Sequence, residues 1–155
     1  MPEPRPLPSH YNLCFGCGTD HPAGLRLEMQ GAGDRVTGSF LVGEHHQGAP
    51  GLAHGGIVSA ALDEAMAFLL WLVERPAVTA HIEVDFRRPV PTGSRLDLEA
   101  VLEGTEGRKI VARGTARVGD EVVATGRAVF VEVGMEHFAP HAERMGLDAQ
   151  GLFNP

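Results

Sequence analysis

The sequence lacks a disulfide framework, a basic surface and a targeting segment, and each absence excludes a class of protein. Its 2 cysteines are separated by only two residues, which does not fit the disulfide pattern of a small secreted protein. The formal net charge of -7 argues against a general nucleic-acid binder, because neutralising phosphates requires a basic face. There is no signal-peptide pattern and no apolar run that approaches membrane-spanning length. We therefore expect a cytoplasmic protein without a membrane partner.

Familiar catalytic and nucleotide-binding patterns are also missing. Ser59 does not lie in a Gly-x-Ser-x-Gly turn, which argues against a serine hydrolase of that type. Neither a P-loop nor a dinucleotide-binding glycine pattern is found. Any chemistry must therefore rest on another arrangement of groups.

What is present is the composition of one ordinary globular domain. With 43% hydrophobic and 21% charged residues, a chain of this length can bury a core of its own. The proline-rich start predicts a flexible N-terminal arm over residues 1–13. Residues 14–133 form the expected domain, and residues 134–155 are expected to be a tail with at most one short helix.

Hydrophobic periodicity predicts one long helix and six strands. The segment 54–74 is apolar nearly all round, which predicts an enclosed helix that ends at Arg75-Pro76. Period-two alternation predicts the strands, at residues 25–30, 35–42, 77–86, 96–102, 108–118 and 121–133. In the third of these, Thr79 and His81 are expected on the face opposite Ile82. The order predicts an α+β fold in which one long antiparallel sheet wraps around a central buried helix.

The start of the predicted helix has the residues of an oxyanion site. His54-Gly55-Gly56 leaves backbone N–H groups bare at the positive end of the helix dipole, where they can stabilise an anion or a developing oxyanion. Asp63 lies farther along the same apolar helix, and a buried carboxylate is costly unless it is partnered or used. Chemistry at a polarised carbonyl would use both features. The alternative is a tight glycine turn, with Asp63 paired to an arginine of a strand.

The spacing of these groups has a consequence for assembly. Asp63 follows His54 by nine residues, which on a helix corresponds to a rise of about 13 Å. A reacting carbonyl must lie within about 3 Å of both the oxyanion donor and the attacking group. One straight helix cannot meet both requirements, so the catalytic interpretation predicts a homodimer with two sites across its interface. Glu64 is the rival carboxylate, but it lies about 100° around the helix from Asp63 and is not expected to share its pocket.

Several motifs together resemble the hotdog-fold acyl-CoA thioesterases, in particular the PaaI-like branch of the 4-hydroxybenzoyl-CoA thioesterase superfamily. These motifs are His54-Gly55-Gly56 with Asp63, the preceding Gln-Gly-Ala-Pro-Gly of 47–51, Thr79, the Phe-Arg-Arg-Pro-Val-Pro-Thr-Gly of 86–93, and Cys-Phe-Gly-Cys-Gly of 14–18 with Pro-Ala-Gly-Leu of 22–25. The resemblance covers residues 14–133. It implies a hotdog fold and a homodimer or homotetramer.

The resemblance also implies roles for residues of the site. Asp63 matches the catalytic carboxylate, acting as general base on water or as nucleophile on the thioester. Gly55 matches the residue whose backbone N–H polarises the thioester oxygen. His54 matches the motif histidine that shapes the pocket, and Thr79 matches a Ser/Thr position that orients the water or the carboxylate.

Substrate contacts are expected from Gly56, Gln47, Arg87 and Arg88. The two arginines are the best candidates for the CoA phosphates, although they are equally well explained as solvated charges at a strand end. One position departs from the family pattern. Many relatives have an asparagine six residues before the motif histidine, where this chain has Gly48, and Gln47 is the candidate replacement for its substrate contact.

The sequence therefore predicts an acyl-CoA thioesterase that hydrolyses an aryl- or medium-chain acyl-CoA without a metal or other cofactor. One alternative is an enoyl-CoA hydratase or hydroxyacyl dehydratase on the same fold, with His54 or His46 paired to an acid. Another is a non-catalytic acyl-CoA binding or sensor module.

The Cys14-x-x-Cys17 pair, flanked by His10 and His21, has the spacing of half a zinc knuckle. The sequence has no second cysteine pair, so a packing role in a loop is expected instead.

Overall fold

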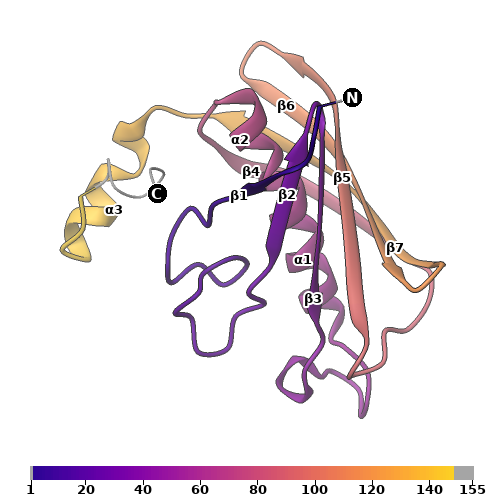
Figure 1. Ribbon diagram of the computed structural model, residues 1–155. Coiled ribbons are helices and arrows are strands. Elements are labelled where there is room, and N and C mark those ends of the chain that lie inside the picture. The colour runs from indigo at the N-terminus through magenta and orange to yellow at the C-terminus, as the bar shows by residue number, and fades with distance from the viewer. Residues whose placement is uncertain (1, 149–155) are drawn as a thin grey trace.

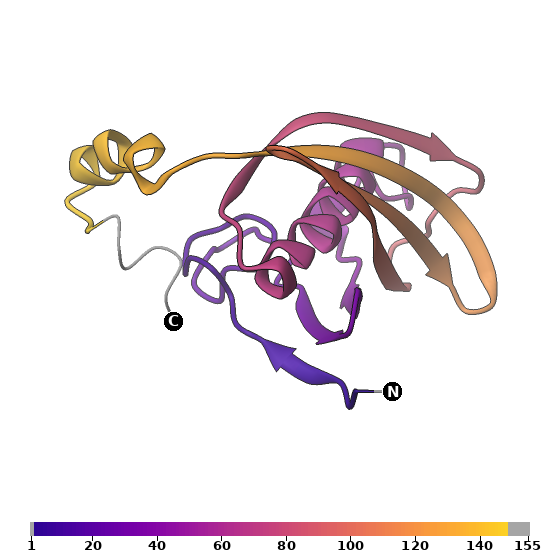
Figure 2. The same ribbon diagram turned by 90° about the horizontal axis from the view of Figure 1, so that it is seen from above.

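The computed structural model describes residues 2–148, which form one curved antiparallel sheet around a central helix (Figure 1). The strands are β1 (Arg5–Leu7), β2 (Glu28–Ala32), β3 (Arg35–Leu41), β4 (Ala77–Phe86), β5 (Arg95–Glu106), β6 (Lys109–Val118) and β7 (Glu121–Glu132). The helices are η1 (Glu44–His46), α1 (Gly55–Ala67), α2 (Leu69–Val73), η2 (Met135–His137) and α3 (Ala139–Arg144). The sheet order is β1-β2-β3-β5-β6-β7-β4. Seen from above, the sheet curves around α1 (Figure 2). The α+β fold predicted from the sequence is confirmed.

Close packing between α1 and the sheet sets the position of the helix. The buried residues of α1 recur at helical spacing and form one stripe: Val58, Ala61, Leu62, Ala65 and Met66. Gly114 of β6 and Gly126 of β7 are paired directly opposite each other beneath this stripe. A Cβ atom added to Gly114 would lie 3.1 Å from Leu62, and one added to Gly126 would lie 3.3 Å from Met66. The missing side chains thus allow the helix to lie directly against the sheet.

The N-terminal segment differs from the prediction of a flexible arm over residues 1–13. Within it, Arg5–Leu7 forms β1 and pairs with β2 at the edge of the sheet. Three residues are too few to show period-two alternation, and Pro6 lies within the strand. An edge strand accepts a proline because one side of the strand needs no ladder hydrogen bond.

The predicted long helix is divided in two. α1 ends at Ala67, Phe68 joins it to α2, and Glu74 caps α2 in the left-handed conformation with φ 54°. The first predicted strand also begins later than expected, at Glu28. Leu25 and Leu27 are buried, so their alternation with polar residues reflects packing of an irregular segment rather than a strand.

The segment Gly55–Val73 corrects the expectation that no apolar run approaches membrane-spanning length. These 19 residues are long and apolar enough to cross a membrane by length and composition. In the fold they form the central helices α1 and α2. The buried stripe of α1 packs against the sheet, which accounts for the apolar composition.

The expected tail at residues 134–155 is described as far as residue 148. This part contains the 3-10 helix η2 and the short α-helix α3. Pro140 lies in the first turn of α3, where its missing N–H removes no helical hydrogen bond. Residues 149–155 lie outside the described residues.

Candidate active site

The start of α1 offers one backbone donor rather than two. His54 is the N-cap, and its Nδ1 accepts the N–H of Gly56 at 2.8 Å. The Gly55 N–H makes no hydrogen bond within residues 2–148. Gly56 was expected to contact substrate, but its donor is already used by His54. Because Nδ1 accepts, a neutral His54 ring holds its proton on Nε2.

A surface cavity of about 320 Å³ opens beside this helix start. Its lining includes Gly55, Phe86, Arg87 and Arg88. The structure therefore brings the predicted oxyanion donor and both predicted phosphate-binding arginines to one cavity. Arg88 also lies 3.5 Å from Glu121, with both side chains mostly exposed, a pairing that contributes little and leaves the guanidinium available to a phosphate.

Asp63 contacts a hydroxyl rather than an arginine. Its Oδ1 accepts a hydrogen bond from Thr79 Oγ1 at 2.9 Å. Burial raises the pKa of the Asp63 carboxyl, and the hydrogen bond from Thr79 opposes that change. None of the ion pairs among residues 2–148 includes Asp63. The described residues therefore do not form the alternative arrangement, in which Asp63 pairs with an arginine of a strand.

A β-bulge brings Thr79 to Asp63. In β4, Thr79 pairs with Phe130 and His81 pairs with Val129, so the intervening residue has no partner. Directly opposed residues present their side chains to the same face of a sheet. Phe130 is buried against the helix side, and Thr79 therefore faces α1 instead of the opposite face predicted by strict alternation. Bulges commonly redirect a side chain beside a functional site in this way.

Gln47 and His46 hold the loop before α1. The side-chain Nε2 of Gln47 donates to the Glu44 carbonyl at 2.8 Å, and its Oε1 accepts the Gly51 N–H at 2.7 Å. Both ends of the amide are thus engaged, which does not support the substrate contact predicted for Gln47. His46 is buried, and its Nδ1 accepts the Gly43 N–H at 2.9 Å. That contact gives His46 a structural role and weakens the hydratase alternative that would use it as a catalytic base.

A larger cavity of about 560 Å³ lies between the N-terminal segment and the far end of the helices. Apolar side chains of three segments line it, among them Leu7, Phe68, Leu70, Trp71 and Met135. Glu64 and Ala77 also line the cavity. Glu64 follows Asp63 by one position and Ala77 precedes Thr79 by two, but neither Asp63 nor Thr79 lines the cavity.

The structure keeps Gly55 and Asp63 of one chain apart. Both belong to α1, which is continuous from Gly55 to Ala67, and eight residues of helix span about 12 Å. β4, which carries Thr79, is the outermost strand of the sheet on that side. The Asp63–Thr79 pair therefore lies beside an open sheet edge.

Comparison with known proteins agrees with this architecture. Residues 50–125 match the Thioesterase superfamily. The rat acyl-coenzyme A thioesterase THEM4 is 32% identical over 87 residues, which cover 56% of this chain and 37% of the relative. The mouse acyl-coenzyme A thioesterase THEM5 is 30% identical over 99 residues, which cover 63% of this chain and 40% of the relative. The chain thus spans about two fifths of the length of these curated relatives.

Solved structures show the same fold. A thioesterase superfamily protein superposes with a TM-score of 0.73 at 26% identity, over 78% of this chain and 61% of that one. A mutant of the phenylacetic acid degradation protein PaaI from Thermus thermophilus has a TM-score of 0.64 at 26% identity, over 70% and 95% of the two chains. A Streptococcus mutans protein bound to acetyl-CoA has a TM-score of 0.66 at 17% identity, over 70% and 89%.

Proposed function

We propose that this chain, whose fold matches that of solved thioesterases and whose residues 50–125 match the Thioesterase superfamily, hydrolyses an acyl-CoA thioester to a free acid and CoA. The observation that carries the proposal is the hydrogen-bonded pair of Asp63 on α1 and Thr79 on β4. It supplies a half-buried carboxylate that is held in one orientation and is engaged by no cation among residues 2–148.

The proposed reaction needs only groups of the protein and water. The N–H of Gly55 donates to the thioester oxygen and stabilises the negative charge that develops there. Asp63 accepts a proton from the attacking water, or attacks the carbonyl carbon itself to form an anhydride that water then hydrolyses to the free acid and the Asp63 carboxylate. Thr79 holds the carboxylate in position through its hydroxyl. The bond from the carbonyl carbon to sulfur breaks, and the leaving thiolate takes up a proton to give CoA.

We place each site between two chains of a homodimer. A second chain that pairs with the open edge of β4 about a two-fold axis continues the sheet and lays its own α1 antiparallel beside the first. The Gly55 end of one helix then lies near the middle of the other, where Asp63 is. Phe86 on β4 is a large apolar side chain that is 57% accessible in the single chain. Its exposure supports the proposal that a second chain covers this edge. A tetramer would be built from two such dimers.

The cavities suggest how an acyl-CoA is held. Arg87 and Arg88, beside Gly55, are placed to bind phosphates of CoA. The apolar cavity of about 560 Å³ is large enough for an aryl or a medium-chain acyl group. The acetyl-CoA bound to the Streptococcus mutans neighbour supports this ligand class. Both cysteines are free thiols, as the reducing cytoplasm that we propose for the protein would keep them.

A panel of acyl-CoAs tests the function against its two rivals. We expect release of free thiol with aryl- or medium-chain substrates, followed with a thiol reagent while the acyl product is identified by mass. A product hydrated on its acyl chain, with CoA still attached, would instead indicate a hydratase. Tight binding without turnover would indicate a sensor module.

Mixed dimers test the placement of the site between chains. Asp63→Asn and Gly55→Pro each remove one half of the proposed site, and each homodimer is expected to be nearly inactive. Random mixing makes half of the dimers mixed, each with one intact site, so about a quarter of wild-type activity should return. The rate of thiol release after unfolding and refolding the two variants together measures it. Activity no greater than the sum of the separate variants would place both groups of a site in one chain.

A further inference from the structure

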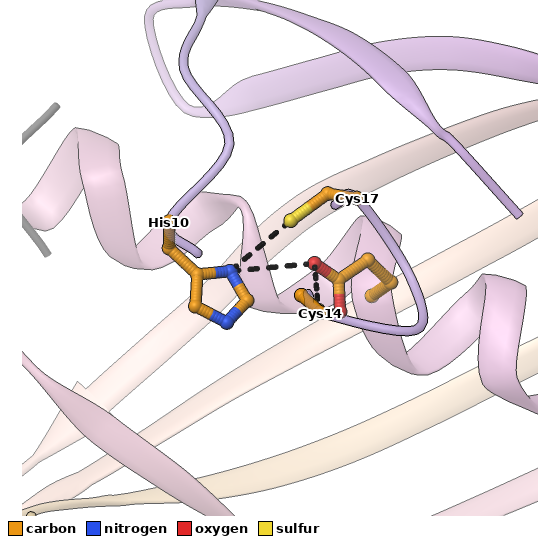
Figure 3. Close-up of side chains that lie close together, drawn as sticks. His10, Cys14 and Cys17 are labelled. Atoms are coloured by element: carbon orange, nitrogen blue, oxygen red, sulfur yellow. Dashed lines mark hydrogen bonds and ion pairs between the residues drawn. The ribbon is translucent and has the colours of Figure 1, made fainter. Parts of the chain in front are cut away.

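Four metal-binding side chains meet beside α1, outside the proposed catalytic groups. His10, Cys14 and Cys17 come from the N-terminal segment and its following loop, and their side chains lie close together (Figure 3). The fourth side chain is that of Glu64 on α1. One ligand atom from each residue lies within 4.8 Å of all the others. Glu64 is turned toward this loop, whereas its neighbour Asp63 contacts Thr79 on β4. The two carboxylates therefore have different hydrogen-bond partners.

We propose that His10, Cys14, Cys17 and Glu64 bind one Zn²⁺ ion. Tetrahedral zinc with bonds of about 2.0–2.3 Å places its ligand atoms about 3.3–3.8 Å apart. Cys17 Sγ lies 3.2 Å from His10 Nδ1, and His10 Nδ1 lies 3.6 Å from Glu64 Oε1. Cys14 Sγ lies 3.7 Å from the same carboxylate oxygen. These three separations match the edges of a zinc tetrahedron to within a few tenths of an ångström.

The loop has the shape that such a site requires. A Cβ atom on Gly16 would overlap the Glu64 carboxyl group, so a side chain at this position would move the Glu64 carboxylate out of its place in the cluster. A Cβ atom on Gly18 would lie 2.4 Å from the Asn12 carbonyl oxygen. Ser9 Oγ donates to Cys17 Sγ at 3.4 Å. Hydrogen bonds of this kind orient the residues that bind a metal and support the charge of a thiolate.

The donor set selects the ion. Two thiolates, an imidazole and one carboxylate suit Zn²⁺, whereas Ca²⁺ and Mg²⁺ take oxygen ligands. Four protein ligands close the coordination sphere, which is typical of a structural site. The ion would clamp the segment that carries β1 onto α1 at the residue next to Asp63. The proposal differs from the expected packing role of the cysteine loop, which rested on the absence of a second cysteine pair, and from the expectation that an acyl-CoA thioesterase needs no metal.

Zinc content and cobalt absorption of the full chain test the proposal. After purification with a reductant, titration with Zn²⁺ should saturate at one ion per chain. Substitution with Co²⁺ should give the visible absorption of a tetrahedral ion and the charge-transfer bands of two thiolates. Cys17→Ser should lower the intensity of the thiolate bands, because only the Cys14 thiolate remains. Glu64→Gln should weaken zinc binding by at least about tenfold, measured by competition with a chromophoric chelator.

His21→Asn provides a matched control. His21 also flanks the cysteines in the sequence, but its Nδ1 accepts the Ala23 N–H at 3.2 Å and it is not one of the four clustered side chains. Zinc binding in this variant should equal that of the wild type. Loss of binding in His21→Asn with retention in Glu64→Gln would overturn the assigned ligands. A wild-type chain that gives no tetrahedral Co²⁺ spectrum and takes up no Zn²⁺ would overturn the site, and neither wild-type measurement depends on a variant folding.

Discussion

Asp63→Asn is expected to lower the rate of acyl-CoA hydrolysis by at least about 100-fold while the protein stays folded and assembled, the scale associated with losing a positioned acid–base group. The amide can neither accept a proton from water at neutral pH nor attack the thioester. The fold should tolerate the change, because burial already favours the uncharged form of this side chain and the Asn oxygen can still accept the hydrogen bond from Thr79. The rate of thiol release under saturating substrate measures the loss of activity. The thermal unfolding midpoint and the mass in solution show whether the variant stays folded and assembled.

Asp85→Asn is the matched control for this variant. Asp85 is an exposed carboxylate of β4, and removing its charge changes the net charge of the chain by the same amount. Its activity should remain near that of the wild type. Near-normal hydrolysis by Asp63→Asn, or an equal loss in both variants, would refute the role assigned to Asp63.

Gly55→Pro is expected to lower kcat by about 100- to 1,000-fold, the cost of removing one oxyanion-hole donor. The substitution removes the N–H and leaves the helix start intact. Gly55 is the first residue of α1, the helical position at which proline is favoured. His54 has φ −63° and ψ 138°, the extended conformation that a residue before proline prefers. Single-turnover thiol release separates this loss from weaker substrate binding.

Gly55→Ala restores the missing donor at the same position. Its Cβ atom would meet Phe86 at 3.6 Å, an ordinary van der Waals contact. We expect this variant to keep most of the activity, because its N–H is unchanged. If alanine and proline reduce kcat equally, the effect comes from crowding at Phe86 and the backbone N–H has no part in the reaction.

The sequence predicted the general architecture well because apolar residues recur at regular intervals along its strands and fill its central helix. Alternation along β5, β6 and β7 identified the sheet, and the apolar segment after His54-Gly55-Gly56 identified the helix inside it. β1 was missed because Arg5–Leu7 is held by pairing with β2 and has too little length for a pattern of its own.

The site was harder to predict because it depends on departures from regular periods and on contacts between distant segments. Strict alternation placed Thr79 on the wrong face, since it takes no account of the extra residue between Thr79 and His81. The cysteine spacing indicated part of the cluster around Glu64. The carboxylate itself follows Cys14 by 50 positions, and a single sequence does not show that the fold unites them.

The open edge at β4 makes the stability of the proposed homodimer depend on the protein concentration. Nine of the ten residues of this strand pair with β7, and within the described part of the chain the strand has no partner on its other side. An exposed edge of this kind recruits further strands. Pairing with a second copy removes that edge from both chains and stabilises the folded state by mass action. For the proposed homodimer, we therefore expect dilution to lower the stability of the fold and the number of completed sites, and we expect separated chains to be the species most exposed to aggregation.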